Sequence, residues 1–427
     1  MSAANEVEGL KFVILNLRVV ILSLRVVILS LSKDGFAMSK FLLGINYWPR
    51  RSAMYMWQQF DIDEIGEDMA RIKALGLDVV RFFLMWEAFQ PEPNAMDAGA
   101  LRRFDAVMDA IAGAGLQAMP TLFCGHMSGV NWLPPWTLER ETSQGRFRTI
   151  SRGAVVDRSI GDFYANPELL RAQVLFARRV GERAREHPAL FAWDLGNEFS
   201  NLRDPVRPQD AADWSLRLSE TLRDASGGRV TGGMHGEDLE RDRNIRPSSI
   251  ALPWAFPTMH GYSVYSAFAR DRLDTNVVPF LCQLQASFSG KAVLFSELGN
   301  PECPPQSSRV NGFACLDETE MASYGRGAID RLYARGALGA FWWCWADYDL
   351  ALAQLPPFDC APHELRFGVV RSDGTAKPVA QMLSQLAAEA REVVVPPPAP
   401  IADEGAHYAG LPQSIEHEYR EYCERYA

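Results

Sequence analysis

The stretch FAWDLGNEFSN, residues 191–201, decides how we interpret the rest of the chain. Its first half is an apolar and aromatic run with one polar interruption, which is typical of a buried strand in a parallel sheet. Asn197 and Glu198 follow where that strand ends. A carboxylate at the mouth of a parallel strand packs poorly, but it is well placed to contact a ligand held above the sheet.

The same pattern returns one hundred residues later. KAVLFSELG, residues 291–299, is another apolar strand that ends in a single acidic residue, Glu297. Our working hypothesis is therefore a site built on two glutamates at strand ends.

Short apolar runs alternate with segments of helical periodicity from residue 41 onwards. We expect eight strands, at residues 41–48, 78–86, 116–123, 191–195, 229–235, 257–263, 292–297 and 337–345. We expect helices at about 61–75, 97–114, 167–186, 209–225, 274–288, 318–335 and 378–391. This alternation predicts a single (β/α)8 TIM barrel rather than a doubly wound sheet. The loop after the third strand, from Cys124 to about Asn166, is long enough to shape the mouth of a site.

Three regions follow from composition. Residues 1–37 contain a perfect tandem repeat of LRVVILS, which favours a non-native or disordered extension over a signal peptide because arginines interrupt the apolar run. We expect residues 38–395 to form the barrel that carries the strand-end glutamates. After a proline-rich stretch at 393–400, the acidic and aromatic tail 396–427 is expected to pack on the barrel or on a partner subunit.

The overall balance of residues excludes several partners. A net charge of -10 and a pI near 5.3 argue against nucleic acid, and we expect no membrane association. Seven cysteines without regular spacing favour free thiols and a cytoplasmic location, with a periplasmic or secreted one as the alternative if residues 1–37 act as a signal. A bridge from Cys303 to Cys315 or Cys360 stays open.

All strand ends of such a barrel open on one face, so residues far apart in sequence converge there. Two carboxylates facing each other among aromatic side chains suit cleavage of a glycosidic bond. One carboxylic acid protonates the leaving oxygen, and the other attacks or activates water at the anomeric carbon. The strand-end residues are Asn46, Trp48, Arg81, Trp86, His126, Glu198, His235, His260, Tyr262, Glu297, Trp343 and Trp345.

The ordered set of strand-end residues resembles the retaining β-glycosidase clan that includes the family 5 glycoside hydrolases. The resemblance covers residues 41 to about 391 and rests on Arg81, Asn197-Glu198, His260-Gly-Tyr262, Glu297 and Trp343. It implies that Glu198 is the acid/base and Glu297 the nucleophile. It also implies substrate contacts from the remaining residues.

We expect the two glutamates to differ in charge. Repulsion and partial burial would raise the pKa of Glu198 so that it is protonated, while Arg81 and Tyr262 would keep Glu297 ionised. Asn197 would donate to the sugar 2-hydroxyl.

Three of the other residues are expected to bind substrate: Trp343 would lie under the sugar, and His260 and Tyr262 would contact it. For several more, a functional and a structural role are both open. Arg81 could be an internal ion pair or a support for the nucleophile, and His126 a substrate ligand or a loop histidine. Trp48 and Trp86 are candidates for the pocket wall or the core, whereas Asp194 is expected to be structural and His235 is less favoured.

The chain carries no HExxH, GxGxxG, phosphate loop or GxSxG motif, so we expect neither a metal nor a cofactor. The long third loop resembles that of exo-β-mannosidase-like members of family 5. We therefore expect exo-cleavage of β-mannosides or β-glucosides in short oligosaccharides, with retention. Endo-mannanase or endo-glucanase action, transglycosylation and a non-catalytic carbohydrate-binding barrel are the alternatives. A homo-oligomer is left open.

Overall fold

The computed structural model describes residues 40–142, 145–304, 306–310, 312–393 and 401–426. The expectation for residues 1–37 concerns a segment outside this range, as does most of the proline-rich stretch.

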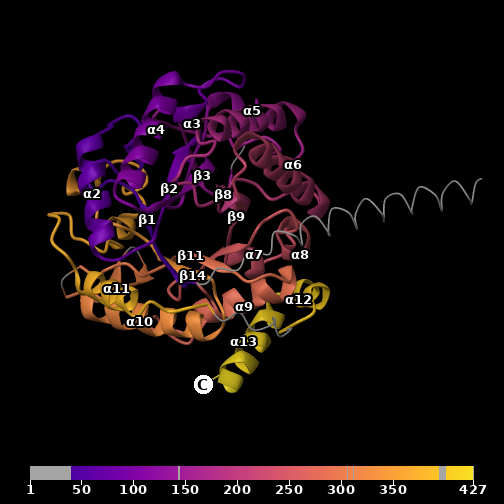
Figure 1. Cartoon of the computed structure of the whole chain (residues 1–427). Coiled ribbons are helices and arrows are strands. Elements are labelled where there is room, and N and C mark those ends of the chain that lie inside the picture. Colours follow the sequence, from indigo (N-terminus) through magenta and orange to yellow (C-terminus); the bar gives the residue numbers. More distant parts are fainter. Residues whose placement is uncertain (1–39, 143–144, 305, 311, 394–400, 427) are drawn as a thin grey trace, which may run out of the picture. The chain divides into compact units, whose positions relative to one another are not determined.

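Eight parallel strands close into a barrel, which confirms the expected (β/α)8 fold (Figure 1). Their order around the barrel is β1-β14-β11-β10-β9-β8-β3-β2, so every chain neighbour among the eight is also a spatial neighbour. The strands are β1 Leu42–Tyr47, β2 Val79–Met85, β3 Gln117–Cys124, β8 Trp193–Asn197, β9 Val230–His235, β10 Thr258–His260, β11 Leu294–Leu298 and β14 Gly339–Trp342.

Helices surround the barrel where periodicity predicted them. They are α2 Ile62–Ala74, α4 Ala98–Gly113, α5 Pro167–Arg183, α6 Pro208–Ser226, α9 Val277–Ser289, α10 Glu318–Ala334 and α11 Pro378–Ala388. Helix α2 shows why the ends fall where they do. The Asp61 side chain accepts from the backbone N–H groups of Asp63 and Glu64, and Gly76 then adopts a positive φ after the helix.

The connection after β9 departs from eight regular strand-helix units. It contains two helices of four residues each, α7 Glu237–Glu240 and α8 Pro247–Ile250. The segment between them is rich in charge, so it lacks the apolar stripe that a longer helix would bury.

The long loop after β3 contains strands of its own. β4 His126–Met127, β5 Val130–Trp132, β6 Arg148–Ser151 and β7 Ala154–Val156 form a four-stranded sheet. Its strands begin directly after β3, so the sheet stands at the carboxyl end of the barrel.

The tail forms two helices that contact the barrel side, α12 Glu404–Gly410 and α13 Gln413–Tyr426 (yellow in Figure 1). The Tyr419 ring of α13 lies 4.8 Å from Phe268 and 5.1 Å from Phe280, centroid to centroid. The Tyr408 hydroxyl of α12 donates to the backbone oxygen of Asp238, at 2.8 Å.

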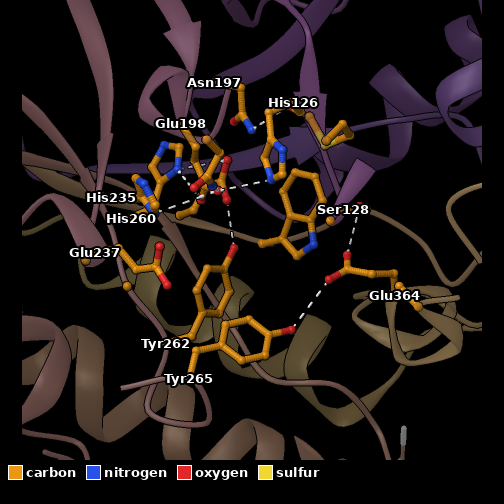
Figure 2. A pocket seen from close by; sticks show the side chains of 18 of the residues that line it. His126, Ser128, Asn197, Glu198, His235, Glu237, His260, Tyr262, Tyr265 and Glu364 are labelled. Carbon is orange, nitrogen blue, oxygen red and sulfur yellow. Dashed lines mark hydrogen bonds and ion pairs between the residues drawn. The ribbon is translucent and has the colours of Figure 1, made fainter. Parts of the chain in front are cut away.

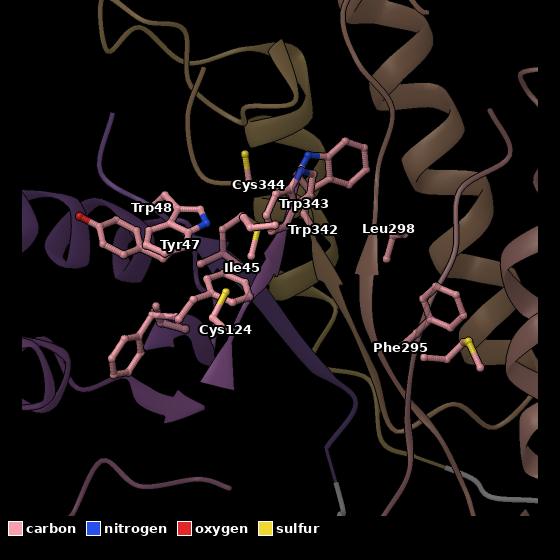
Figure 3. Packing of buried hydrophobic residues seen from close by; sticks show 14 of the residues in the cluster. Ile45, Tyr47, Trp48, Cys124, Phe295, Leu298, Trp342, Trp343 and Cys344 are labelled. Atoms are coloured by element: carbon pink, nitrogen blue, oxygen red, sulfur yellow. The ribbon is translucent and has the colours of Figure 1, made fainter. Parts of the chain in front are cut away.

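The core fills the barrel and the space under the helices. Figure 3 shows Ile45, Cys124, Phe295 and Trp342, which come from four different strands and are fully buried. Among the described residues, no helix has both the length and the apolar content needed to cross a membrane.

Candidate active site

The carboxyl ends of the strands surround a pocket of about 460 Å³ (Figure 2). Eight of the residues singled out from the sequence line it together. They are His126, Asn197, Glu198, His235, His260, Tyr262, Glu297 and Trp343.

Arg81 lies beneath this pocket and is completely buried. Its guanidinium donates to Asp194 Oδ2 at 2.8 Å through Nε, to Asn46 Oδ1 at 2.9 Å and to Asn197 Oδ1 at 3.0 Å. It also forms an ion pair with Glu297. Arg81 therefore has both of the roles considered for it, because the same side chain forms an internal ion pair with Asp194 and contacts Glu297 directly.

A break in the regular pairing of β8 makes this network possible. Strict alternation would place Asp194 and Asn197 on opposite faces of the strand, but the register against β9 shifts between them. Gly233 is needed at this point, because a Cβ there would lie 2.0 Å from the Gly196 carbonyl oxygen. The expected structural role of Asp194 is thus to anchor Arg81.

Glu198 follows β8 in a left-handed conformation, with φ of 46°. A non-glycine residue in this region is strained by about 1–3 kcal/mol, and such residues cluster at functional sites. The turn directs the carboxyl into the pocket, where Oε1 lies 3.2 Å from His260 Nδ1 and Oε2 accepts from Asn201 at 2.9 Å. His126 and His235 each place a ring nitrogen 3.9 Å from Oε2.

Glu297 is held from three sides within β11. The Tyr262 hydroxyl donates to Oε2 at 2.7 Å, Arg81 pairs with Oε1, and His260 Nδ1 lies 3.4 Å from Oε1. One oxygen of Glu198 and one of Glu297 lie within 4.8 Å of each other. This spacing matches the separation of about 5–5.5 Å in retaining glycosidases and not the 6.5–9.5 Å of inverting ones.

The charges of the two glutamates in the ligand-free protein are the reverse of the expectation. Burial raises the pKa of Glu297 to about 8, against the effect of Arg81 and with the help of the Glu198 charge. Burial also acts to raise the pKa of Glu198, but His235 and the other two histidines around it lower that pKa below its usual range. The two carboxyls are therefore coupled and share one proton, and their surroundings favour its place on Glu297 before substrate binds.

The three histidines around Glu198 differ in the direction in which their pKa values are shifted. Burial lowers the pKa of His126 to about 4 and that of His260 to about 3. The pKa of His235 is instead raised despite burial, because Asp238 and Glu198 stabilise its cation. His235, which the sequence favoured less, thus lines the pocket in surroundings that favour its charged form.

The same centre is where a cation could be held. Glu198, His260 and Glu297 offer three ligand atoms within 4.8 Å of one another. Arg81 already supplies positive charge directly to Glu297, so these carboxylates have a partner without a metal. The arrangement suits acid/base and nucleophilic work.

The tryptophans divide between pocket and core. Trp343 lines the pocket, whereas Trp48 stacks on Phe83 at 5.1 Å and is fully buried. Trp86 is also fully buried and donates its indole N–H to Gln90 at 2.8 Å. The structure therefore places Trp48 and Trp86 in the core, where their rings pack against Phe83 and Phe123.

Three acidic residues of the pocket, Glu237, Glu240 and Glu364, were not singled out from the sequence. Glu364 accepts hydrogen bonds from Ser128 at 3.0 Å, from the Tyr265 hydroxyl at 3.5 Å and from Trp343 (Figure 2). Burial raises the pKa of Glu364 to about 7. It lies in a 3-10 turn, Pro362–Arg366, of the loop after β14, where no strand end or helical period marked it.

A disulfide shapes the rim near Glu364. Cys303 and Cys315 are bridged, so the expectation of free thiols is wrong for these two. Between them, strands β12 Arg309–Val310 and β13 Phe313–Ala314 pair as a hairpin. Phe313 lines the pocket, with its ring 5.1 Å from Tyr265 and 4.7 Å from His363.

Known proteins share both this barrel and parts of the sequence. The family model described as β-galactosidase, of glycoside hydrolase family 42, matches residues 54–213. An exo-β-1,4-mannosidase from Opitutaceae bacterium strain TAV5 is 26% identical, with a TM-score of 0.68 over 82% of this chain and 60% of that chain. The expected resemblance to the family 5 glycoside hydrolases and their clan is confirmed.

Two further proteins extend the comparison. A GH5_18 protein from Streptomyces cattleya, solved as an alanine variant with Manβ1-4GlcNAc, has a TM-score of 0.72 at 20% identity over 90% of each chain, which shows the shared fold. The β-galactosidase LacZ of Heyndrickxia coagulans is 26% identical over 162 residues, or 38% of this chain. This chain spans only about a fifth of that protein's length, because the match covers 22% of it.

Proposed function

We propose that the chain is a retaining β-glycoside hydrolase that releases single sugars from one end of short β-mannosides. The observation that carries this proposal is the pair Glu198 and Glu297, with carboxyl oxygens within 4.8 Å in a pocket of about 460 Å³. The family 5 relatives described as exo-mannosidase or bound to Manβ1-4GlcNAc support the choice of sugar.

In the first step, Glu297 attacks the anomeric carbon while Glu198 protonates the departing glycosidic oxygen. The C–O bond to the leaving sugar breaks as the bond to the Glu297 carboxylate forms. Arg81 and the Tyr262 hydroxyl hold Glu297 and stabilise its ionised form. In the second step Glu198 takes a proton from water, which displaces Glu297 and restores the enzyme.

Before the first step, the shared proton has to move from Glu297 to Glu198. His260 Nδ1 lies 3.2 Å from one carboxyl and 3.4 Å from the other, so a single imidazole spans the route. Substrate binding favours the transfer, because a sugar oxygen placed beside Glu198 accepts from its protonated form.

Two loops support exo action by meeting at one side of the pocket. Ser128, in the loop after β3, donates to Glu364 in the loop after β14, at 3.0 Å. Arg148 and Asp359 join the same two loops by an ion pair, with Nη1 and Oδ2 2.8 Å apart. A cleft joined across in this way holds the end of a chain rather than its middle.

The test is hydrolysis of aryl β-glycosides and of manno-, gluco- and galacto-oligosaccharides, with the length of the products measured. We expect single mannose units from the wild type, and losses of at least about 1,000-fold in Glu198→Ala and Glu297→Ala. The matched control is Glu168→Ala, because its side chain is 84% exposed and far in sequence from the strand ends.

Stereochemistry provides a second readout. The first sugar released should keep the β configuration, which proton NMR detects before mutarotation. Inversion, or full activity in Glu297→Ala, would refute the two-carboxylate assignment. Products of intermediate length would favour endo action, and preferred cleavage of galactosides would favour the β-galactosidase relatives.

For location, we propose the periplasmic or secreted alternative over the cytoplasmic one. The Cys303–Cys315 bridge supports this choice, since disulfides persist mainly in oxidising compartments. Thiol titration of the protein isolated from its own cells would test it, and two additional reactive thiols under denaturing conditions would count against it.

A further inference from the structure

His235 is connected to a buried polar chain behind the pocket. Its Nε2 lies 3.0 Å from Ser200 Oγ and 3.6 Å from Asp238 Oδ1, and its backbone N–H donates to Asp238 Oδ2 at 3.1 Å. The Ser200 hydroxyl donates to Asp238 Oδ1 at 2.6 Å. Asp238 is fully buried, and its carboxylate accepts from both neighbours. The other ring nitrogen of His235 faces Glu198.

Asp238 belongs to α7, a helix of one turn that has little to hold it in place by itself. Helix α12 supplies two hydrogen bonds to it. The Tyr408 hydroxyl donates to Asp238 O at 2.8 Å, and His407 Nε2 lies 2.9 Å from Leu239 O. His407 is itself fixed through Nδ1 by Glu418 of α13, at 2.7 Å.

We propose that His235 is a positioning residue for Glu198, and that helix α12 maintains this role by holding α7 and its Asp238 behind the imidazole. The inference rests on the proposed function only where it refers to catalysis. Whether the imidazole of His235 is protonated beside Glu198 does not depend on which substrate the enzyme cleaves.

The charged groups around His235 come from several elements. Asp238, Glu237 and Glu240 face it from α7, Glu198 from the end of β8, Asp204 from the loop after β8, and Arg146 from the loop before β6. The uncharged imidazoles of His126 and His260 complete the surroundings. Five acidic groups against one guanidinium favour the imidazolium form of His235. Asp238 is the largest of these favourable contributions, so displacing α7 weakens the cation.

The proposal is tested first on the imidazole itself. NMR titration of protein carrying 13C-labelled histidine follows all seven histidines, and the signal missing in His235→Gln identifies His235. We expect this signal to titrate above the ordinary value of about 6.5 in the wild type. In Tyr408→Phe, which removes one hydrogen bond to α7, the midpoint should fall by at least half a pH unit.

A matched control separates the role of α12 from general support by the tail. Tyr419→Phe also removes one tail hydroxyl, but that hydroxyl donates to Asp274 at 2.7 Å, away from α7. Its His235 midpoint should equal that of the wild type. A midpoint at or below 6.5 in the wild type, or equal midpoints in wild type and Tyr408→Phe, would overturn the proposal.

Kinetics give the second readout. Removing the His235 cation raises the pKa of Glu198, so the acid limb of kcat/KM should move up by about one pH unit or more in His235→Gln. Tyr408→Phe should move it in the same direction by a smaller amount. A lower rate with an unmoved limb would mean that His235 only supports the structure. If the protein hydrolyses none of the substrates, the proposed function is refuted. The NMR titration still tests the role of His235, because it does not depend on activity.

Discussion

Replacing Glu364 by glutamine should change how stability depends on pH. Burial raises the pKa of Glu364 from 4.5 to about 7, so the folded protein keeps a proton that the unfolded chain releases. The stabilising contribution of this proton is fully present below pH 4.5 and is lost as the pH rises through 7. At about 1.4 kcal/mol per pH unit, the difference between the two values corresponds to about 3 kcal/mol.

Glu364→Gln has no charge to bury, and its amide oxygen still accepts from Ser128. The variant should therefore escape this loss. For roughly 380 folded residues, the entropy of unfolding is about 0.8 kcal/mol per degree, so 3 kcal/mol corresponds to about 4 °C. Between pH 5 and pH 8 about 2.5 kcal/mol of this contribution is lost, because part of it is already gone at pH 5, so the Tm of the variant should rise relative to wild type by about 3 °C.

Thermal unfolding followed by circular dichroism in buffers of equal ionic strength measures this difference. Glu168→Gln serves as the control, since the same replacement at a side chain that is 84% exposed should shift Tm equally at both pH values. If the Tm difference between Glu364→Gln and wild type is constant from pH 5 to pH 8, the buried-carboxyl reasoning is refuted.

Three further predictions concern the site and its rim. Tyr262→Phe removes the hydrogen bond of 2.7 Å to Glu297. Because a hydrogen bond to a charged group contributes about 1.5–3 kcal/mol, kcat should fall about 10–100-fold. Circular dichroism should show that the variant is still folded. The pH profile of kcat/KM should fall above pH 8, because the proton shared by Glu198 and Glu297 is lost there; a rate that keeps rising to pH 9.5 would contradict this assignment. Replacing both Cys303 and Cys315 by serine should lower the free energy of unfolding by about 2–3 kcal/mol, as measured in urea, since the bridge closes a loop of 12 residues.

Much of the fold could be predicted because it depends on local patterns. Apolar runs and helical periodicity mark the strands and helices, and barrel closure then brings Arg81, Glu198 and Glu297 to one place whatever their separation in sequence. The exceptions are segments without such patterns. Glu364 and Asp238 lie in short turns after strands, where neither period nor strand end marks a residue as functional.

The orientation of the side chains on β8 and the protonation of the two glutamates could not be predicted from the sequence for a different reason. Arg81 reaches both Asp194 and Asn197 only because β8 breaks its alternation, and this irregularity depends on the close approach of Gly233 to the neighbouring strand. The position of the proton that Glu198 and Glu297 share depends on three histidines that lie within 4 Å of Glu198. Such distances are properties of the packed structure, so the sequence predicted which residues carry charge but not the direction in which the pKa of each glutamate is shifted.

The division between the Arg81 network and the rim has a consequence for laboratory evolution. Asn46, Arg81 and Asp194 are buried in the barrel, where Arg81 donates hydrogen bonds to both of the others, so that losing Arg81 would leave a buried carboxylate without its cation. The rim is built from separate insertions, the sheet after β3 and the hairpin between Cys303 and Cys315. Libraries that seek new sugar preferences should therefore randomise the insertions and leave the three buried residues unchanged, because chemistry and selectivity reside on parts of the chain that can vary independently.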